Sequence, residues 1–205
     1  MIVHYMKQQT PEWNEIKKMK FTASHASTIL TCDKGLNTLI EEMLAEHYSS
    51  GCYEDYSNKY KNAQITRGNE YEDKARSIYE LETGNTVEQV GFVEMNENVG
   101  CSPDGLVNDD GLIEIKNHND LVFLRLVETG KIDKKYYNQM QFQMYVTGRK
   151  WCDYFGFNPN FTPCFYKKRI YQDSEVFKRL DEVLPVAVQR LMMRKNVLDK
   201  VLSVA

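Results

Sequence analysis

The sequence of 205 residues predicts an α/β fold in which helices flank a central sheet. Apolar residues recur at helical spacing in the first part of the chain and in its last third, and between these parts the spacing changes to the alternation typical of strands. No glycine-rich phosphate-binding motif follows a predicted strand, which argues against a doubly wound nucleotide-binding fold. The chain has no linker rich in Pro, Ser or Gly, so we expect a single domain over residues 1–205.

The first part of the chain predicts three helices. A short helix is expected at 22–30, entered through a threonine or serine cap, and a second at 37–48, capped by an asparagine or threonine at its start. The third covers 68–82 and ends at Gly84, because glycine readily adopts the left-handed conformation that closes a helix. The polar stretch 51–63 predicts a surface loop.

The rest of the chain predicts five strands and two helices. The first three strands follow one another as a meander, separated by turns rich in Asn, Asp and Gly. The C-terminal helix is expected to be kinked or split at Pro185. The strands are predicted at 87–95, 99–107, 112–116, 151–157 and 165–171, and the helices at 136–147 and 174–202.

The composition excludes several classes of protein. With 42% hydrophobic and 27% charged residues, the chain is neither disordered nor a coiled-coil rod. No apolar run approaches the roughly 20 residues of a membrane span, and the N-terminus lacks an apolar signal core, so we expect a cytoplasmic protein with no membrane partner. The net charge of −3 argues against a protein that coats nucleic acid nonspecifically.

The five cysteines give no sign of a metal centre of their own. No two of them have C-x-x-C spacing, which leaves a zinc ribbon or finger without ligand pairs and weakens the case for an iron–sulfur cluster. Reduced thiols in a cytoplasmic protein are the simplest interpretation.

One stretch of the sequence combines residues that suit phosphodiester chemistry. Asp104 follows a proline, and Glu114 and Lys116 lie on a predicted strand ten and twelve residues later. Alternate side chains of a strand share a face, so Glu114 and Lys116 point the same way, whereas the isoleucines beside Glu114 enter the core. A tight turn can bring Asp104 next to Glu114, and two close carboxylates favour a hard divalent cation. A lysine beside them can orient a water or help to deprotonate it, or it can stabilise the charge that develops on a phosphate.

A structural interpretation competes with this one. Asp-Gly is common in turns, and alternating Glu and Lys is common on the exposed face of a strand. The spacing between Asp104 and Glu114, rather than any single residue, favours a nuclease site.

These residues resemble the PD-(D/E)xK nuclease superfamily, and the chain more narrowly resembles the phage lambda exonuclease family of YqaJ-type viral recombinases. The resemblance covers nearly the whole chain and implies a restriction-endonuclease-like core, with a central mixed sheet flanked by helices. It rests on Glu12-Trp13, Phe21–Ser24, Gly68–Glu72, Cys101–Leu106, Gly111–Lys116 and Gln139–Thr147 followed by Trp151.

The resemblance implies roles for nine residues. Four of them would hold metal, Lys116 would be the catalytic lysine, and Gln139 would lie near the scissile phosphate. Lys17 stands where the family has an arginine, so it keeps the charge but loses the bidentate fork, which puts the strength of 5′-phosphate preference in doubt. The metal ligands implied are Asp104, Glu114, Glu72 and the carbonyl of Ile115, and the phosphate-binding residues implied are Lys17, Ser24 and Ser102.

The activity that the resemblance implies is Mg²⁺-dependent digestion of the 5′-ended strand of linear double-stranded DNA. Two Mg²⁺ ions would be held, and Mn²⁺ would be able to replace them. The 3′ single-stranded overhang would pass to a phage single-strand annealing protein in homologous recombination. A ring-shaped homotrimer around the duplex would make digestion processive, inside a bacterial host of a phage or prophage.

Other functions remain open on the sequence alone. An endonuclease of the same fold would use the same residues but would also cut closed circular DNA. A catalytically inactive module would bind DNA ends without consuming them. An iron–sulfur nuclease would need a late cysteine cluster, for which Cys152 and Cys164 are too few, and a glycosidase would leave Lys116 without a role.

Overall fold

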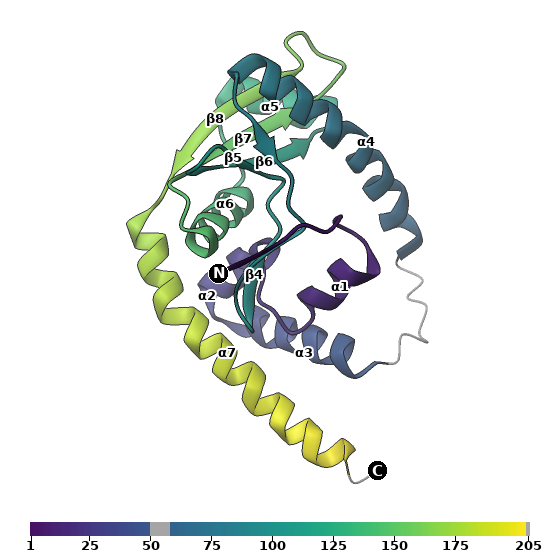
Figure 1. Ribbon diagram of the computed structural model, residues 1–205, viewed down its shortest axis with the longest axis vertical. Helices are drawn as coiled ribbons and strands as arrows, with labels where there is room; N and C mark the ends of the chain where they lie inside the picture. The colour runs from purple at the N-terminus through teal and green to yellow at the C-terminus, as the bar shows by residue number, and fades with distance from the viewer. Residues whose placement is uncertain (50–57, 204–205) are drawn as a thin grey trace.

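A computed structural model describes residues 1–49 and 58–203, with the backbone alone for residues 58–70. Its strands form two sheets, and helices surround them (Figure 1). In chain order the elements are β1 Ile2–His4, α1 Pro11–Lys17, η1 Ala23–His25, α2 Ala26–Thr31, α3 Lys34–Tyr48, α4 Asn58–Thr83, β2 Val87–Glu88, β3 Phe92–Asn96, β4 Val99–Cys101, β5 Gly105–Val107, β6 Gly111–Asn117, α5 Asp120–Thr129, α6 Lys134–Thr147, β7 Trp151–Phe157, β8 Phe165–Tyr171 and α7 Ser174–Leu202.

The larger sheet has five strands in the order β2-β5-β6-β7-β8. β6 and β7 pair in parallel, and the other neighbours are antiparallel. A parallel pair needs a crossover connection, which α5 and α6 supply between β6 and β7. The predicted α/β class, with a central mixed sheet flanked by helices, is confirmed.

The two faces of this sheet are buried by different helices. On one face, Ile113 and Ile115 pack with Ala75 and Tyr79 of α4. On the other face, Leu112 belongs to a larger core that also takes in α2, α3, α6 and α7. All seven residues of β7 are buried, because β7 lies inside the sheet and is covered on both sides.

The predicted three-strand meander is wrong. The segment 87–95 divides into β2 and β3, and 99–107 divides into β4 and β5, because the chain leaves the five-stranded sheet and returns to it. In between, β3 pairs with β1 and β4 to form the three-stranded sheet β1-β3-β4. The first crossing uses Gly91, where a Cβ would collide with the Met6 carbonyl. The second crossing contains Pro103, which has no N–H to donate to a ladder.

Several helices differ from their predicted bounds. α3 begins three residues early, because Asp33 caps it by accepting from the amide of Gly35. Residues 58–63 of the predicted loop belong to α4, and the rest of that loop lies outside the described residues up to 57. α7 continues as one helix through Pro185, so the predicted split is wrong.

Helices α1 and α5 were not predicted. α5 follows Asn119, whose side chain accepts from the amide of Val122, and it ends at Gly130 with a left-handed φ of 61°. Four large apolar side chains of α5 are exposed.

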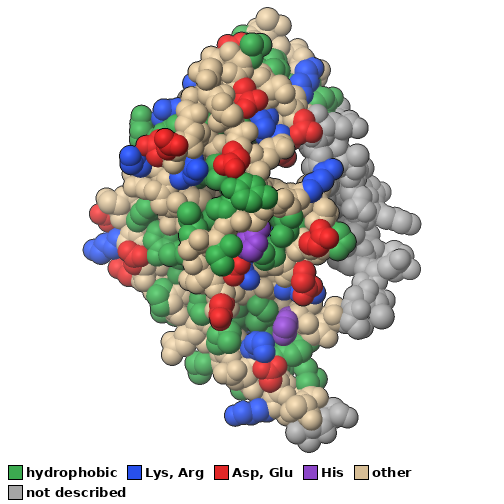
Figure 2. Space-filling view, in the orientation of Figure 1, with side chains coloured by type: hydrophobic (Ala, Val, Ile, Leu, Met, Phe, Trp, Pro, Cys, Tyr) green, Lys and Arg blue, Asp and Glu red, His purple; other side chains and the backbone are tan. Residues whose placement is uncertain are grey.

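The surface carries charges of both signs. Figure 2 shows Lys and Arg interspersed with Asp and Glu on one face, with no continuous patch of either sign. Within the described part of the chain, no helix combines the length and the apolar character needed to cross a membrane.

Candidate active site

Strand β6 places one carboxylate and one ammonium group on the same face of the sheet, as alternation predicts. The side chain of Glu114 is completely buried and that of Lys116 is 24% exposed. The two side chains form an ion pair between Lys116 Nζ and Glu114 Oε1. Burial alone would lower the pKa of Lys116, but the carboxylates of Glu114 and Asp104 outweigh it and raise the pKa above its ordinary value. Lys116 is therefore a cation at neutral pH.

Asp104 lies near the Glu114–Lys116 pair because it directly precedes β5, which is paired with β6. The ladder runs from Val107 opposite Gly111 to Gly105 opposite Ile113. One step further, Asp104 Oδ2 accepts from the backbone amide of Ile115 at 2.7 Å. The Asp104 carboxylate thus accepts a hydrogen bond of the kind that a backbone carbonyl accepts within the sheet. The donor is the amide of the peptide bond between Glu114 and Ile115.

The pKa of Asp104 is raised well above its ordinary value. Burial contributes most, and the nearby charge of Glu114 adds to it, while Lys116 and the Ile115 amide act against the rise. The carboxylates of Asp104 and Glu114 are therefore close enough for the charge of one to disfavour the charge of the other.

Glu72 approaches the same site from helix α4. Burial raises its pKa most, and the charges of Asp73 and Glu114 add to the rise, whereas Arg76 lowers it. Arg76 Nη2 donates to Glu72 Oε1 at 2.8 Å and to the carbonyl of Asp104 at 3.3 Å. Arg76 is only 8% exposed and also pairs with Asp73, so it joins α4 to the segment that carries Asp104. Neither Arg76 nor its position was predicted.

Glutamine 143 holds the other oxygen of Glu114. Gln143 Nε2 donates to Glu114 Oε2 at 2.7 Å, and both side chains are fully buried. Gln139, which is predicted to lie near the scissile phosphate, is half-buried one turn earlier on α6, and this role stays a prediction. Gln139 and Gln143 lie four residues apart on α6, and the orientation of this helix brings Gln143 to Glu114.

The donor set fits a hard divalent cation. Asp104, Glu114 and Glu72 offer carboxylate oxygens, which Mg²⁺ prefers, and a cation among them would relieve the repulsion that raises the pKa of Asp104. In the described residues, however, no three His, Cys, Asp or Glu side chains are already gathered as a metal-binding group. Lys116 and Arg76 pair with two of the three carboxylates. The metal ligands, including the Ile115 carbonyl, therefore stay a prediction.

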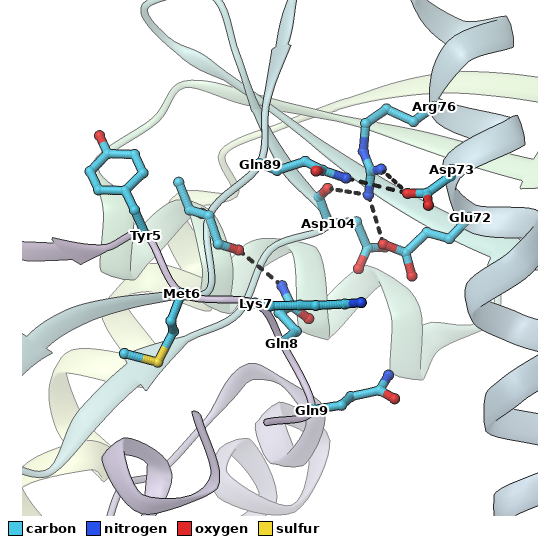
Figure 3. Close-up of a pocket in the computed structure, with 11 residues that line it drawn as sticks. Tyr5, Met6, Lys7, Gln8, Gln9, Glu72, Asp73, Arg76, Gln89 and Asp104 are labelled. Atoms are coloured by element: carbon cyan, nitrogen blue, oxygen red, sulfur yellow. Dashed lines mark hydrogen bonds and ion pairs between the residues drawn. The ribbon is translucent and has the colours of Figure 1, made fainter. Parts of the chain in front are cut away.

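A cavity of about 550 Å³ opens beside these carboxylates (Figure 3). Glu72, Arg76 and Asp104 line one side of it, and the N-terminal segment that includes Lys7 and Gln8 lines the other. Gln8 Nε2 donates to the carbonyls of residues 90 and 103, which fixes this segment against both chain crossings. In the view of Figure 3, the Lys7 side chain extends toward the carboxylates.

The residues predicted to bind phosphate are connected through Trp13. The Trp13 indole donates to Ser102 Oγ at 2.9 Å, and Lys17 Nζ lies 3.6 Å from the centroid of a Trp13 ring. Burial lowers the pKa of Lys17, and in turn the Lys17 charge contributes to the lowered pKa of His25, after burial. Ser24, the exposed neighbour of His25, has its hydroxyl 3.2 Å from Thr22 Oγ1. The role of Lys17, Ser24 and Ser102 in binding phosphate stays a prediction.

Comparisons with known proteins place the chain among nucleases. Residues 12–150 match the model of the YqaJ-like viral recombinase domain. The chain is similar to LHK-Exo, an alkaline exonuclease from Laribacter hongkongensis. For its complex with dAMP the identity is 31% and the TM-score 0.83, over 96% of this chain and 100% of that one. A second LHK-Exo structure gives 30% identity and a TM-score of 0.76, over 94% and 100% of the two chains.

A more distant structure shares the fold alone. A phage-related exonuclease from Haemophilus somnus 129PT is 15% identical with a TM-score of 0.62, over 90% of this chain and 99% of that one. No curated protein matches the sequence.

Proposed function

Because the chain belongs to the YqaJ-like viral recombinase domain family, we propose that it digests the 5′-ended strand of linear double-stranded DNA in a reaction that depends on Mg²⁺. The chain is a deoxyribonuclease, in keeping with its alkaline exonuclease relatives at 30% and 31% identity. The observation that carries the proposal is the convergence of Asp104, Glu114 and Lys116 at the end of the β5–β6 ladder.

The carboxylates and the lysine have separate tasks in this mechanism. Asp104, Glu114 and Glu72 would hold the metal, two ions in the full form of the proposal. When bound, Mg²⁺ would polarise the phosphoryl oxygen and stabilise the charge of the leaving group. Lys116 is a cation held by Glu114, so it can donate hydrogen bonds to the phosphate and stabilise its developing negative charge. In the proposed reaction a water molecule attacks the phosphorus atom and the bond to the leaving 3′ oxygen breaks. Because Lys116 is already protonated, it does not take the proton of that water.

The remaining polar residues would position the DNA. The cavity beside Asp104 and Glu72 has room for a terminal nucleotide, with Lys7 on its opposite wall. Lys17, Ser24 and Ser102 would bind the 5′ phosphate.

The wider setting of the reaction is also part of the proposal. We expect a 3′ overhang as the product, a phage single-strand annealing protein as the partner and a homotrimeric ring around the duplex. Such a ring would enclose the DNA, so the enzyme would digest processively. The proposed location is the cytoplasm of the bacterial host. We also propose that residues 1–205 form a single exonuclease domain.

The test compares three substrates: linear duplex with a 5′ phosphate, linear duplex without it, and a covalently closed circle, each with Mg²⁺ and with EDTA. Digestion of the linear forms alone, in Mg²⁺ alone, supports the proposal. Asp104→Ala and Lys116→Ala should abolish digestion, whereas Asp109→Ala, an exposed aspartate of the β5–β6 turn, should leave it unchanged. Full activity of Asp104→Ala would contradict the mechanism.

Two other outcomes identify the competing functions. Nicking or linearisation of the closed circle would indicate an endonuclease of the same fold. Binding of linear ends without any loss of DNA would indicate an inactive end-binding module.

A further inference from the structure

A second pocket begins at the residues that directly follow Lys116 in the chain, and its walls carry an excess of positive charge. The pocket has a volume of about 440 Å³ and lies between the end of β6, helix α5 and the start of α6. Its basic lining residues are Arg125, Lys131 and Lys135, and its acidic one is Asp133.

The chain path explains why these cations meet. After Lys116, the chain leaves β6 and enters α5 through Asn119, and α5 packs against β7 because Gly156 has no side chain to keep Leu126 away. A Cβ at Gly156 would lie 2.6 Å from Leu126 Cδ2. The chain then reverses at Gly130, in the left-handed conformation, and enters α6, so that Lys131 and Lys135 return toward Arg125.

The positive charges in the pocket are largely uncompensated. Among the described residues, the side chains of Arg125 and Lys131 make no ion pair, and Lys135 has only Asp133, at 3.9 Å. Asp133 is itself engaged at the start of α6, where its carboxylate accepts from the Lys135 amide at 2.9 Å. A ligand with negative charge would therefore add what the pocket lacks.

The positive field of the pocket continues into the catalytic site. His118, on the inner wall, bonds to the Tyr154 hydroxyl at 2.7 Å, and burial, Lys116 and Lys135 all lower its pKa. The Lys116 ammonium lies 5.1 Å from the centroid of the Tyr136 ring, which lines the same pocket. Tyr136 thus lines the pocket and also lies close to the catalytic lysine.

We propose that this pocket binds a backbone phosphate of the DNA substrate and so fixes the position of the duplex relative to the catalytic lysine. This inference rests on the proposed function, because it assumes that DNA lies across Lys116. Phosphate contacts of this kind set register and orientation and carry no sequence information.

The experiment measures the salt dependence of binding. A fluorescent duplex with one free end is titrated with Arg125→Ala, Lys131→Ala and Lys135→Ala in EDTA, from low to moderate salt. The matched control is Lys134→Ala, which removes an exposed lysine of α6 that does not line the pocket. All four side chains are exposed, so we expect the four variants to have the same melting temperature as the wild type.

Each lost phosphate contact should lower the slope of log Kd against log salt by about 0.9. The affinity for DNA should fall by the same factor whatever the sequence of the duplex. The control should keep the wild-type slope. Pocket variants with the same slope as Lys134→Ala would overturn the proposal.

Two further arms separate the possible failures. If wild-type protein neither binds nor digests linear duplex, the proposed function fails; if wild type digests DNA and the pocket variants match the control, the inference alone fails. A deoxynucleoside monophosphate is also tested as an inhibitor. Inhibition that Arg125→Ala abolishes, with an unchanged salt slope for duplex, would assign the pocket to the released nucleotide and overturn the proposal.

Discussion

Replacing Lys116 with methionine should destabilise the protein more than replacing the acid that it pairs with. The reason is the difference in burial between the two partners: the Glu114 side chain is completely buried, whereas 24% of the Lys116 side chain is exposed. Lys116→Met leaves a carboxylate in the interior with Gln143 as its remaining donor. Glu114→Gln leaves an ammonium group that can turn toward water, and it removes the repulsion between Glu114 and Asp104.

Breaking a buried ion pair from one side costs about 3–5 kcal/mol, and the partial exposure of Lys116 together with the hydrogen bond from Gln143 favours the lower end of that range. We therefore expect Lys116→Met to lower the free energy of unfolding by about 3 kcal/mol, and Glu114→Gln by less than about 1 kcal/mol. The double variant should regain about 2 kcal/mol relative to Lys116→Met, because the stranded charge is gone.

Urea unfolding in EDTA, followed by circular dichroism, measures all three variants. Lys150→Met is the control, because the pair that it forms with Asp110 is exposed on both sides, and such pairs contribute about 0–1 kcal/mol. The reasoning is refuted if Lys116→Met costs no more than Lys150→Met, or if Glu114→Gln does not restore stability in the double variant.

Three other predictions test the surroundings of the site. Mg²⁺ without DNA should raise the melting temperature of the wild type, since it binds the folded state, and Asp104→Asn should abolish that increase in scanning fluorimetry. Arg169→Met should destabilise the protein by about 3 kcal/mol in urea, because the fully buried Asp153 loses two charge-assisted hydrogen bonds of 2.8 Å; a loss below about 1 kcal/mol would contradict this. Gln143→Leu should lower kcat for DNA digestion by about 10- to 100-fold, as expected for a residue that orients a proposed metal ligand, and an unchanged kcat would contradict this role.

The sequence predicted the bounds of a strand best where the whole segment belongs to a single sheet. Strands β7 and β8 match their predicted bounds, and β7, which is rich in aromatic residues, is buried along its whole length. The sequence pattern could not show that 87–95 and 99–107 each contribute to two sheets. That division depends on the close packing of Gly91 against Met6 and on Pro103, contacts that join distant parts of the chain.

The candidate site was predictable along one strand but not across helices. Alternation on β6 placed Glu114 and Lys116 on one face, and the spacing placed Asp104 near them. Gln143 and Arg76 could not be selected, because their contacts depend on how α6 and α4 are rotated against the sheet. Periodicity indicates that a helix has a buried face, whereas only tertiary packing decides which polar residue on it meets a carboxylate.

The hydrogen bond from the Ile115 amide makes the position of the Asp104 carboxylate, a proposed metal ligand, depend on the pairing of β5 with β6. A slip of β5 by one residue would carry the aspartate away from this amide and reverse the side chains of the strand. The amide proton of Ile115 is therefore a spectroscopic reporter of the carboxylate. Its exchange with solvent would record how often the hairpin opens, and we expect each opening to interrupt the chemistry long before the domain unfolds.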